Sequence, residues 1–525
     1  MLPLIPHIWP LVFCAIPPHR KREEIQRSYR AFNINDDEFC KNAGISVTGE
    51  PLKVTARVLS PPQIFYANGQ VNVAEGKWRL PKFAKFISTS SCQKWVAVLV
   101  DYQFPRPFEF EKLRAFCNDF LEECRIRGMS FAGPQDIVKI SPDDAALDKL
   151  FNDAYKVGIE FILLAHPDGE TILHDHIKTF ERKYMVVTQC VRTSTIDKVI
   201  GKQSKLTLEN FIAKTNVKLG GLNYDVFLKD YEIDRKTLFI GIGMNHPGGG
   251  KLQQEGANES SVSILGYSAN DSHDPGAFIG NFFVQPPFQD ENLSILDDLM
   301  DEVLGRFKRN RGCAPSRVVV YRSGCSEGQF QRVLLYEVPI ILHFVKKYNS
   351  AAPVTFIVPS VLHNVRLFKK DIDPSKRSPE QNIPPGTVVD TTIVHSKFLE
   401  FYLNSHTAIQ GTAKTPRYTV VFTSETHATL DIFERWTNAL CYSYQIVASP
   451  VSVPAPVYVA NCYAERGRQI ANNFGLTKLT AAQKENGLAF SAEDKPEEGK
   501  QEIVKKSYSY NFTHRPTLRD RRINA

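Results

Sequence analysis

Residues 317–330 read "RVVVYRSGCSEGQF", and this stretch governs the interpretation of the whole chain. A β-branched run, which favours an extended strand, leads into a turn and then into the apolar-periodic segment "QRVLLYEVPIILHF". Within the turn, Gly324 to Gly328 match G-x-S-x-G, the strand-to-helix elbow that raises a serine nucleophile above a sheet. The sequence therefore first raises the question of whether Ser326 belongs to a serine hydrolase.

A hydrolase elbow also needs a carboxylate and a histidine base later in the chain, and an oxyanion loop such as "HPGGG" at 246–250. Histidines do follow the elbow, at positions 363, 395, 406 and 427. With 13 histidines and 57 acidic residues in the chain, however, suitable partners will always be found. The strands upstream predict an antiparallel meander, whereas a hydrolase elbow follows a parallel central strand. We therefore keep the serine hydrolase only as a distant alternative.

The composition describes an ordinary globular chain of 525 residues, 42% hydrophobic and 23% charged, with enough apolar material for two or three cores. Its net charge of +7 permits a polyanionic partner without requiring one. The ten cysteines include no C-x-x-C pair, so we expect reduced thiols and no metal. The apolar first 14 residues lack a basic n-region and a cleavage site. We expect a cytoplasmic or nuclear protein that is not secreted and not membrane-bound.

The pattern of apolar residues changes twice along the chain. Residues 20–92 show no long helical period and indicate an extended connecting layer. From 94 to 225, strands and amphipathic helices alternate, which predicts right-handed βαβ units and a parallel sheet. From 236, three strands without room for helices predict an antiparallel meander. Two further strands, with helices at 291–309 and 329–347, are expected to add in parallel and to make a mixed sheet. From about 477 the sequence is polar, which predicts a solvated loop before a basic tail.

The residues around the elbow carry a family resemblance. "YRSGCSEGQFQRVL" at 321–334 resembles the Piwi-domain signature Y-R-D-G-x-S-E-G-Q-F of the Argonaute family, and the resemblance continues through 382–414 and 451–468. "TQCV" at 188–191 and "TNVKLGGLN" at 215–223 are similar to the family's Mid domain, and "RVLSPP" at 57–62 to the linker before it. The family's N-terminal and PAZ domains have no counterpart.

The resemblance implies an α/β fold in which a Rossmann-like Mid domain precedes an RNase-H-like Piwi domain with a mixed sheet flanked by helices. It divides the chain into an apolar N-terminus with a linker remnant at 1–92, a Mid domain at 93–225 and a Piwi domain at 226–525.

The resemblance also implies a catalytic set that this sequence has lost. RNase-H-type cleavage needs grouped carboxylates that hold two hard divalent ions. At the four matching positions stand Gly243, Glu291, Ser323 and Asn461, of which only the glutamate is a carboxylate. We therefore expect a binding protein without slicer activity and without a cofactor. The alternative is an active metal-dependent nuclease that combines Glu291 with substitute ligands such as Asp290 or Asp390.

A second set of residues matches the family's pocket for the 5′ phosphate of a guide RNA. Lys214 and Lys218 lie four apart, so they share one helical face, where an anion between them would relieve their repulsion. The resemblance adds Lys178, Gln189 and Arg466. It also adds His174, where the family usually has a tyrosine that stacks under the first base, with His176 as the alternative.

Histidine with lysine in this pocket resembles the worm-specific Argonaute clade, whose members carry secondary small RNAs with 5′ triphosphates. Three further residues, His406, Ser452 and Tyr458, match positions that touch the guide backbone. The implied partners are a small guide RNA with a 5′ phosphate or triphosphate, a target RNA and silencing effector proteins. The implied function is guided gene silencing, with sequence choice made by base pairing.

Overall fold

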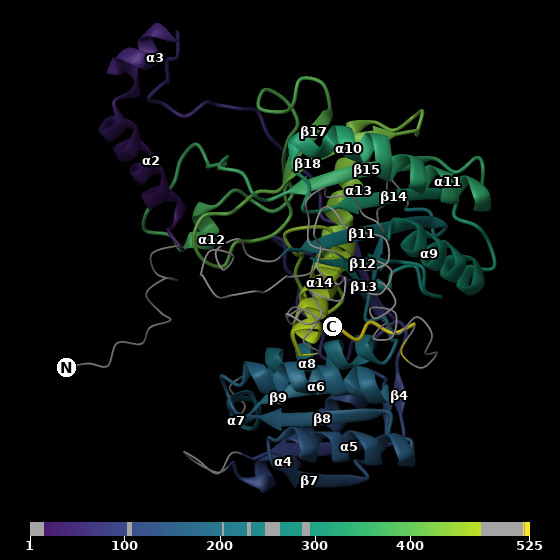
Figure 1. Cartoon of the computed structure of the whole chain (residues 1–525). Coiled ribbons are helices and arrows are strands. Elements are labelled where there is room, and N and C mark those ends of the chain that lie inside the picture. Colours follow the sequence, from purple (N-terminus) through teal and green to yellow (C-terminus); the bar gives the residue numbers. More distant parts are fainter. Residues whose placement is uncertain are drawn as a thin grey trace, which may run out of the picture.

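The computed structural model describes residues 15–101, 108–201, 204–227, 233–246, 263–285, 295–473, 518 and 520–525. Two α/β units carry most of these residues (Figure 1). The first unit lies at the bottom of that view, and the second, with the larger sheet, lies above it. The predicted fold, a Rossmann-like parallel sheet followed by a mixed sheet flanked by helices, is confirmed.

The first unit is built on a four-stranded sheet, in which every neighbouring pair is parallel. In sheet order the strands are β7 (Asp136–Ile140), β5 (Trp95–Val100), β8 (Phe161–His166) and β9 (Val187–Arg192). All six residues of β8 are buried, as expected for a parallel strand covered by helices on both faces. The edge position of β9 leaves its backbone open to groups that approach from either face.

Five helices cover the two faces of this sheet: α4 (Phe110–Ile126), α5 (Asp144–Val157), α6 (Thr171–Tyr184), α7 (Thr193–Ile200) and α8 (Lys205–Lys218). Apolar side chains of α4, α7 and α8 share one core cluster with Ala97 and Leu163. Those of α5 and α6 share another with Val98 and Leu164. Because alternate strand residues point to opposite faces, α6 and α8 lie on opposite sides of the sheet.

The second unit is built on a nine-stranded mixed sheet in the order β1-β16-β17-β18-β15-β14-β11-β12-β13. The strands are β1 (Arg57–Val58), β11 (Thr237–Asn245), β12 (Ser263–Ala269), β13 (Ile279–Gln285), β14 (Arg317–Arg322), β15 (Val354–Ser360), β16 (Thr387–Val389), β17 (Leu399–Asn404) and β18 (Arg417–Thr423). The β11-β12-β13 meander is confirmed. β14 is nevertheless a central strand that runs parallel to both of its neighbours, β11 and β15. That part of our argument against a hydrolase elbow was wrong.

Four long helices sandwich the large sheet. On one face, α9 (Leu296–Arg311) and α11 (Val338–Tyr348) pack against Ile240 and Ile242. On the other face, α13 (Leu430–Tyr442) and α14 (Ala455–Asn473) pack in the cluster that contains Phe239. From this face α14 extends down to the first unit, where it also contacts α6 (Figure 1).

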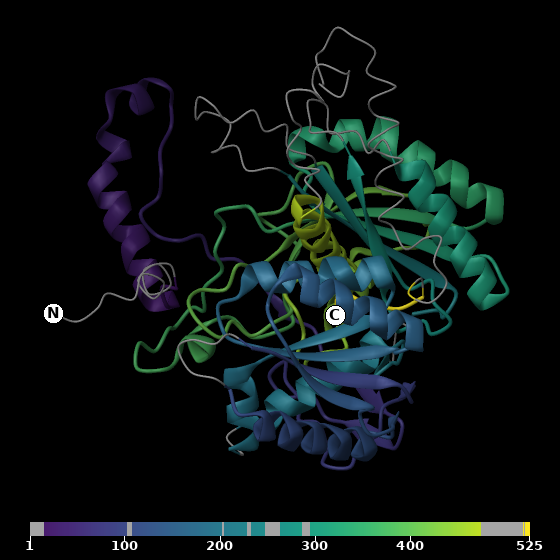
Figure 2. The same cartoon turned by 60° about the horizontal axis from the view of Figure 1, so that its bottom comes forward.

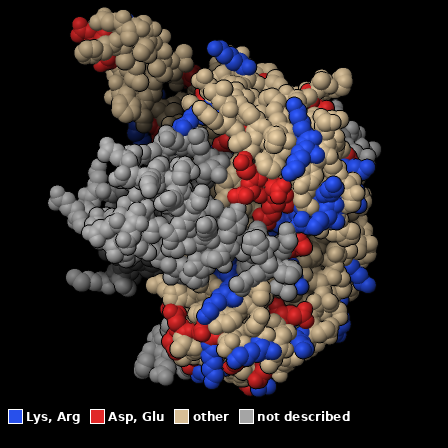
Figure 3. All heavy atoms as spheres, turned by 45° about the vertical axis from the view of Figure 1, so that its right-hand side comes forward, with Lys and Arg blue, Asp and Glu red and all other residues tan. Residues whose placement is uncertain are grey.

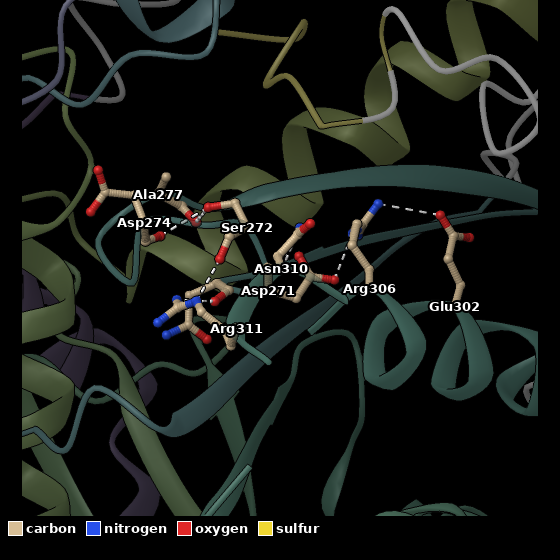
Figure 4. A network of polar contacts seen from close by, with 9 residues as sticks. Asp271, Ser272, Asp274, Ala277, Glu302, Arg306, Asn310 and Arg311 are labelled. Carbon is tan, nitrogen blue, oxygen red and sulfur yellow. Dashed lines mark hydrogen bonds and ion pairs between the residues drawn. The ribbon is translucent and has the colours of Figure 1, made fainter. Parts of the chain in front are cut away.

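A buried polar network fixes the β12–β13 turn to α9 (Figure 4). Arg306 donates from Nε to Oδ2 of Asp271 over 2.7 Å and from Nη1 to Glu302 over 3.3 Å. Arg311 donates to the backbone carbonyl of Ser272 over 2.6 Å. Burial raises the pKa of Asp271 to about 6, although the Arg306 guanidinium opposes that shift. The network holds the meander rigidly at the side of the sheet.

The prediction of a helix-free connecting layer at 20–92 was wrong. Residues Pro18–Phe32 form α2, and Glu38–Asn42 form the short helix α3. Both stand apart from the rest of the molecule (Figure 2). Only Pro18 of α2 is buried, so this helix contributes little to the core. The layer also contains β2 (Gln63–Tyr66) and β3 (Gly69–Val71), which pair into a three-stranded sheet with β10 (Asp225–Phe227).

The remaining elements are short: β4 (Ser91–Cys92), β6 (Ser130–Phe131), α10 (Phe330–Arg332) and α12 (Ser378–Gln381). Nine cysteines fall in the described ranges, and all nine are free thiols. None of the helices described here is long and apolar enough to cross a bilayer. On the face shown in Figure 3, basic and acidic side chains are interspersed, so its described part presents no extended field of one sign. The first 14 residues and the polar stretch from 477 lie outside the described residues.

Candidate nucleic-acid interface

The serine of the elbow caps a helix. Ser326 is the N-cap of the 3₁₀ turn Glu327–Gln329, where its side chain accepts a hydrogen bond from the backbone of Gln329. The Gln329 side chain returns the contact, because its Oε1 accepts from the Ser326 backbone N–H over 2.6 Å. This is a capping box. The nearby His395 contacts Glu327 instead, at 3.4 Å. The Ser326 hydroxyl is therefore used in the cap.

Three of the four degenerate catalytic positions come together beside the elbow. Ser323, directly after β14, lies 3.1 Å from Asn461 of α14, with its hydroxyl Oγ facing the amide Oδ1. It lies equally close to the backbone carbonyl of Ile242 on β11, and its single proton can serve only one of these acceptors. Gly243 follows Ile242 in β11. Ser323 and Asn461 therefore form a neutral hydrogen-bonded pair, with Gly243 directly beside Asn461.

The backbone at Gly243 is in close contact with α14. A Cβ atom built on Gly243 would lie 2.3 Å from Oδ1 of Asn461, 2.9 Å from its backbone nitrogen and 3.1 Å from the carbonyl carbon of Ala460. The first contact could be relieved by a side-chain rotation, whereas the other two involve helix backbone. An aspartate at 243 therefore requires α14 to move.

Carboxylates are scarce around this group. Within the described ranges, no three His, Cys, Asp or Glu residues come close enough together to hold a metal ion. Glu291 and Asp290 lie outside those ranges. Asp390 follows β16, which three strands separate from β14, and it pairs with Arg57 at 3.2 Å. Asp390 is therefore committed elsewhere and cannot complete a site at Ser323.

The second predicted set also converges, at the edge of the small sheet where the two units meet. α6 supplies His174 and Lys178, and α8 supplies Lys214 and Lys218 from the other face of the sheet. Both helices reach the edge strand β9, where Nζ of Lys178 and Nζ of Lys218 donate to the same backbone carbonyl of Thr188, over 3.1 and 2.9 Å. Arg466 approaches on α14 of the second unit.

Lys178 is fully engaged in the structure. Besides the carbonyl, its ammonium group donates to Oγ1 of Thr188 over 2.6 Å and to Oε2 of Glu181 over 2.5 Å. These three bonds use all three of its protons. Thr188 in turn donates to Glu181. Burial would raise the pKa of Glu181, but the charges of Lys178 and Lys218 outweigh it and hold that pKa below its usual value.

The other cations of the cluster are not compensated in this way. No hydrogen bond among the described residues uses the side chain of Lys214 or Arg466, and Lys218 spends only one proton, on Thr188. Burial and the like charges of Lys178 and Arg466 lower the pKa of Lys214 to about 8. Burial also places the pKa of Lys218 well below its usual value. Uncompensated buried cations favour a bound anion.

The two candidate histidines separate clearly. His176 points to α5, where its Nδ1 lies 2.6 Å from a carboxylate oxygen of Asp144. His174 lies near the cations: burial lowers its pKa to about 4, and the charges of Arg466, Lys178 and Lys218 contribute. The His174 imidazole is therefore neutral at physiological pH.

Gln189 lies on β9 between the cations, where it is buried and its Oε1 has no partner among the described residues. Successive strand residues alternate, so Gln189 faces away from Thr188 and Cys190. Burial favours the neutral thiol of Cys190, but the hydrogen bond to His166 and the charge of Lys178 outweigh it and lower the pKa of that thiol.

Sequence reasoning missed Glu181, Thr188 and Cys190. The lysine–glutamate spacing of three in α6 was a signal for the first of these.

The three predicted backbone-contact residues lie on the second unit. Burial lowers the pKa of His406, whose Nδ1 is buried without a partner among the described residues. The ring of Tyr458 on α14 meets Tyr444 edge-on, with ring centroids 4.6 Å apart. Ser452 is half-buried in the segment that precedes α14. Tyr458 and Arg466 lie eight residues apart on one helix, so the same face carries both.

Family models match both units of the chain. The model described as "Piwi domain" matches residues 159–472, and the model described as "Mid domain of argonaute" matches residues 72–157. Neither match tests the predicted limits at 92 and 225, which stay predictions.

Two similar relatives are the proteins named "Argonaute protein wago-1" and "Argonaute protein wago-4" of Caenorhabditis elegans. They are 33% and 32% identical to this chain, over 87% of its length in each case. The chain spans about half of the length of these relatives, 48% and 49%.

Among solved structures, the Kluyveromyces polysporus Argonaute with a guide RNA aligns with a TM-score of 0.77 at 20% identity. The alignment covers 100% of this chain and 62% of that one. Drosophila Piwi aligns with a TM-score of 0.70 at 19% identity, over 87% of this chain and 60% of that one. At such identities these alignments show the fold.

Proposed function

Because the chain belongs to the Argonaute family, we propose that it holds the 5′ phosphate end of a small guide RNA and pairs that guide with target RNA to silence genes. In this proposal the cation cluster of Lys178, Lys214, Lys218 and Arg466 is the 5′-end site. His174 stacks under the first base, and His406, Ser452 and Tyr458 follow the guide backbone. Base pairing then selects the target, while the protein reads backbone and shape.

One observation carries the proposal: Lys214 and Arg466 come from two different units and meet with no counter-ion among the described residues. Cations arranged in this way can surround a phosphate with charge-assisted hydrogen bonds. Lys178, whose protons are all used, acts mainly by fixing β9 and by its charge. The open donors belong to Lys214, Lys218 and Arg466.

The binding proposal predicts a loss that depends on the phosphate. Changing Lys214 or Lys218 to alanine should weaken binding of a 5′-phosphorylated RNA by about 1.5–3 kcal/mol, the range for hydrogen bonds to charged groups. Binding of the same RNA with a 5′ hydroxyl should change much less. Lys205→Ala is the matched control, because Lys205 lies on the same helix and is mostly exposed. Equal losses for both RNAs would count against a 5′-end site. A 5′-triphosphate RNA in the same assay tests which end is preferred.

We further propose that the Piwi domain, an RNase-H-like domain, does not cut. Gly243 offers no ligand, and Ser323 and Asn461 offer neutral oxygens, which bind hard cations weakly. The rival is an active nuclease built on Glu291. Protein loaded with a guide should leave a fully paired target intact in Mg²⁺ or Mn²⁺. Cutting opposite the middle of the guide, abolished by chelator and by Glu291→Ala, would establish the rival. Silencing without cutting requires recruited effector proteins.

A further inference from the structure

Residues 520–525, part of the tail that the sequence predicted to be basic, lie in the seam between the two units. Ile523 and Ala525 are buried. Ala525 packs in one cluster with Val217 of α8, and Nδ2 of Asn524 donates to the carbonyl of Val459 on α14 over 3.2 Å. This C-terminal segment therefore contacts both of the helices that bring Lys214 and Arg466 to the cation cluster.

This segment contains a buried arginine, Arg522. Arg522 is 3% exposed, and its Nη1 donates to the backbone carbonyl of Tyr444 over 2.9 Å. Its guanidinium lies over the Tyr444 ring, 4.7 Å from the centroid. Nε and Nη2 have no hydrogen-bond partner among the described residues. Because an arginine stays ionised in proteins, this is a fixed positive charge without a counter-ion in the described part of the seam.

The position of Arg522 connects it to the proposed 5′-end site. Tyr458, Cys462 and Arg466 are spaced by four residues and form one stripe along α14. Tyr444, on which Arg522 stacks, meets Tyr458 at one end of this stripe, and Arg466 lies at the other end. The charge of Arg522 also acts on Cys462 and on Lys214, whose pKa it helps to lower after the larger effects of burial, Lys178 and Arg466.

We propose that Arg522 is a positioning residue of the 5′-end site, whose fixed charge behind Lys214 and Arg466 strengthens the preference for phosphorylated RNA without touching the phosphate. The inference rests on the proposed function and adds a residue that the Argonaute motifs quoted above do not include. It assigns the C-terminal segment an electrostatic role in addition to its packing role.

The inference has a pH signature with a definite sign. Lys214 must be charged to attract an anion, and its pKa is about 8. The preference for phosphorylated RNA should therefore decline as pH rises above this value. Removal of the Arg522 charge lets Lys214 hold its proton to higher pH. The groups that face Lys214 are Lys178 of α6, Cys190 of β9, Lys218 of α8, Arg466 of α14 and Arg522. Of these, only Arg522 differs in the variant.

The experiment compares the full chain with Arg522→Gln, Arg522→Lys and Arg521→Gln, using one short RNA with a 5′ phosphate or a 5′ hydroxyl between pH 7 and 9. At pH 7 we expect Arg522→Gln to reduce the ratio of the affinity for 5′-phosphorylated RNA to that for 5′-hydroxyl RNA by roughly five-fold. This is the order of magnitude expected when one unit charge near the bound phosphate is removed. In this variant, the preference for phosphorylated RNA should begin to decline at a higher pH than in the unaltered chain. Arg522→Lys should keep both the affinity ratio at pH 7 and the pH at which the preference begins to decline. Arg521→Gln is the control with the same change in net charge, because Arg521 acts on Cys92 instead.

Three results would overturn the inference. The first is an unchanged ratio in Arg522→Gln, and the second is an equal loss of affinity for both RNAs with the pH decline unmoved. If Arg522→Gln does not fold, loss of the ratio in a folded Arg522→Lys is the third. The proposed function fails separately, if the unaltered chain itself shows no preference for phosphorylated RNA or if Lys214→Ala leaves that preference intact.

Discussion

At the scale of single residues, the strand-to-helix elbow brings Ser323 together with two other predicted catalytic positions, Gly243 and Asn461. Gly324, at φ +74°, turns the chain after β14 in a conformation that favours glycine. The turn directs Ser323 to Asn461 and leaves Ser326 to cap the following helix. At this point β11, the end of β14 and α14 are in direct contact.

This contact predicts that one catalytic aspartate cannot simply be restored. Gly243→Asp should lower the free energy of unfolding by about 1–3 kcal/mol, the usual cost of overpacking, because its Cβ would press on the backbone of α14. Gly133→Asp is the matched control, because a Cβ atom at Gly133 would meet no atom within 4 Å. Denaturant unfolding measures both. A Gly243→Asp protein as stable as the unaltered one would contradict this prediction, because it would show that α14 can shift without a measurable cost in stability. We expect no cutting from Gly243→Asp even when it is combined with Ser323→Asp and Asn461→His.

The convergence of Gly243, Ser323 and Asn461 was predictable only because motifs far apart in the sequence matched one family pattern. The partners of Lys178 were not predictable in this way. Glu181 lies one turn away on the same helix, but Thr188 arrives from β9, and only the completed sheet brings it to the ammonium group. A sequence supplies the charges of such a cluster. Which of those charges are already compensated depends on the tertiary structure.

At the scale of elements, one short strand and one charged residue help to attach the linker to the second unit. β1 pairs with β16 at the edge of the large sheet, and Arg57 of β1 contacts Asp390, Asp431 and Glu434. Burial raises the pKa of Glu434 to about 7, because the opposing effect of Arg57 is smaller and Asp390 and Asp431 add to the shift. A carboxyl whose pKa is raised in the folded state stabilises most at low pH, and its contribution is lost as pH rises from its unfolded value toward 7.

Removal of the Arg57 charge should therefore matter more at high pH. Arg57→Ala leaves three carboxylates facing one another, and at pH 8 Glu434 must ionise among them, whereas at pH 6 it can keep a proton. We expect the loss of Tm relative to the unaltered chain to be larger at pH 8 than at pH 6. Adding Glu434→Gln to the variant should remove the difference between the two pH values. A loss that is the same at both pH values without this second change would contradict the assignment to Glu434.

The elements missed from the sequence share a physical cause. In α2, the apolar residues Ile25 and Phe32 are largely exposed, so no core requirement imposes a strong helical period. Most strands and helices of 94–225 were predicted because they bury a continuous face, whereas the half-exposed edge strand β7 and the short helix α7 were missed. The parallel direction of β14 was predicted, but its central position could not be deduced from the order of segments, because it depends on β15 pairing on its far side.

At the scale of the whole molecule, one glutamine joins the two units. Gln445 follows α13 with φ +76° and is buried. Its Oε1 accepts from the backbone N–H groups of Asn223 and Tyr224 over 3.0 and 3.2 Å, and its Nε2 donates to the Tyr224 carbonyl over 2.9 Å. These bonds hold the end of the first unit, just after α8, against the second, and so set the distance from Lys214 to Arg466.

Gln445→Ala should weaken the contact between the two units. It leaves three buried backbone groups without partners, each worth about 1–3 kcal/mol, so we expect a clear drop in Tm. The preference for 5′-phosphorylated RNA should fall as well, because the cluster draws on both units. Gln331→Ala, at an exposed helix position, is the control for calorimetry and RNA binding. A Gln445→Ala protein with an unchanged preference would show that the cluster assembles without this joint.

The position of residues 520–525 also has a consequence for the time at which the protein becomes competent. This segment leaves the ribosome after every other part of the cation cluster has been synthesised, yet it lies between α8 and α14, where Arg522 stacks on Tyr444. While translation continues, the nascent chain can fold both sheets and still lack this piece of the seam. Completion of the cluster therefore waits for residues 520–525, so a nascent chain should acquire the proposed preference for phosphorylated RNA only after this segment has emerged from the ribosome.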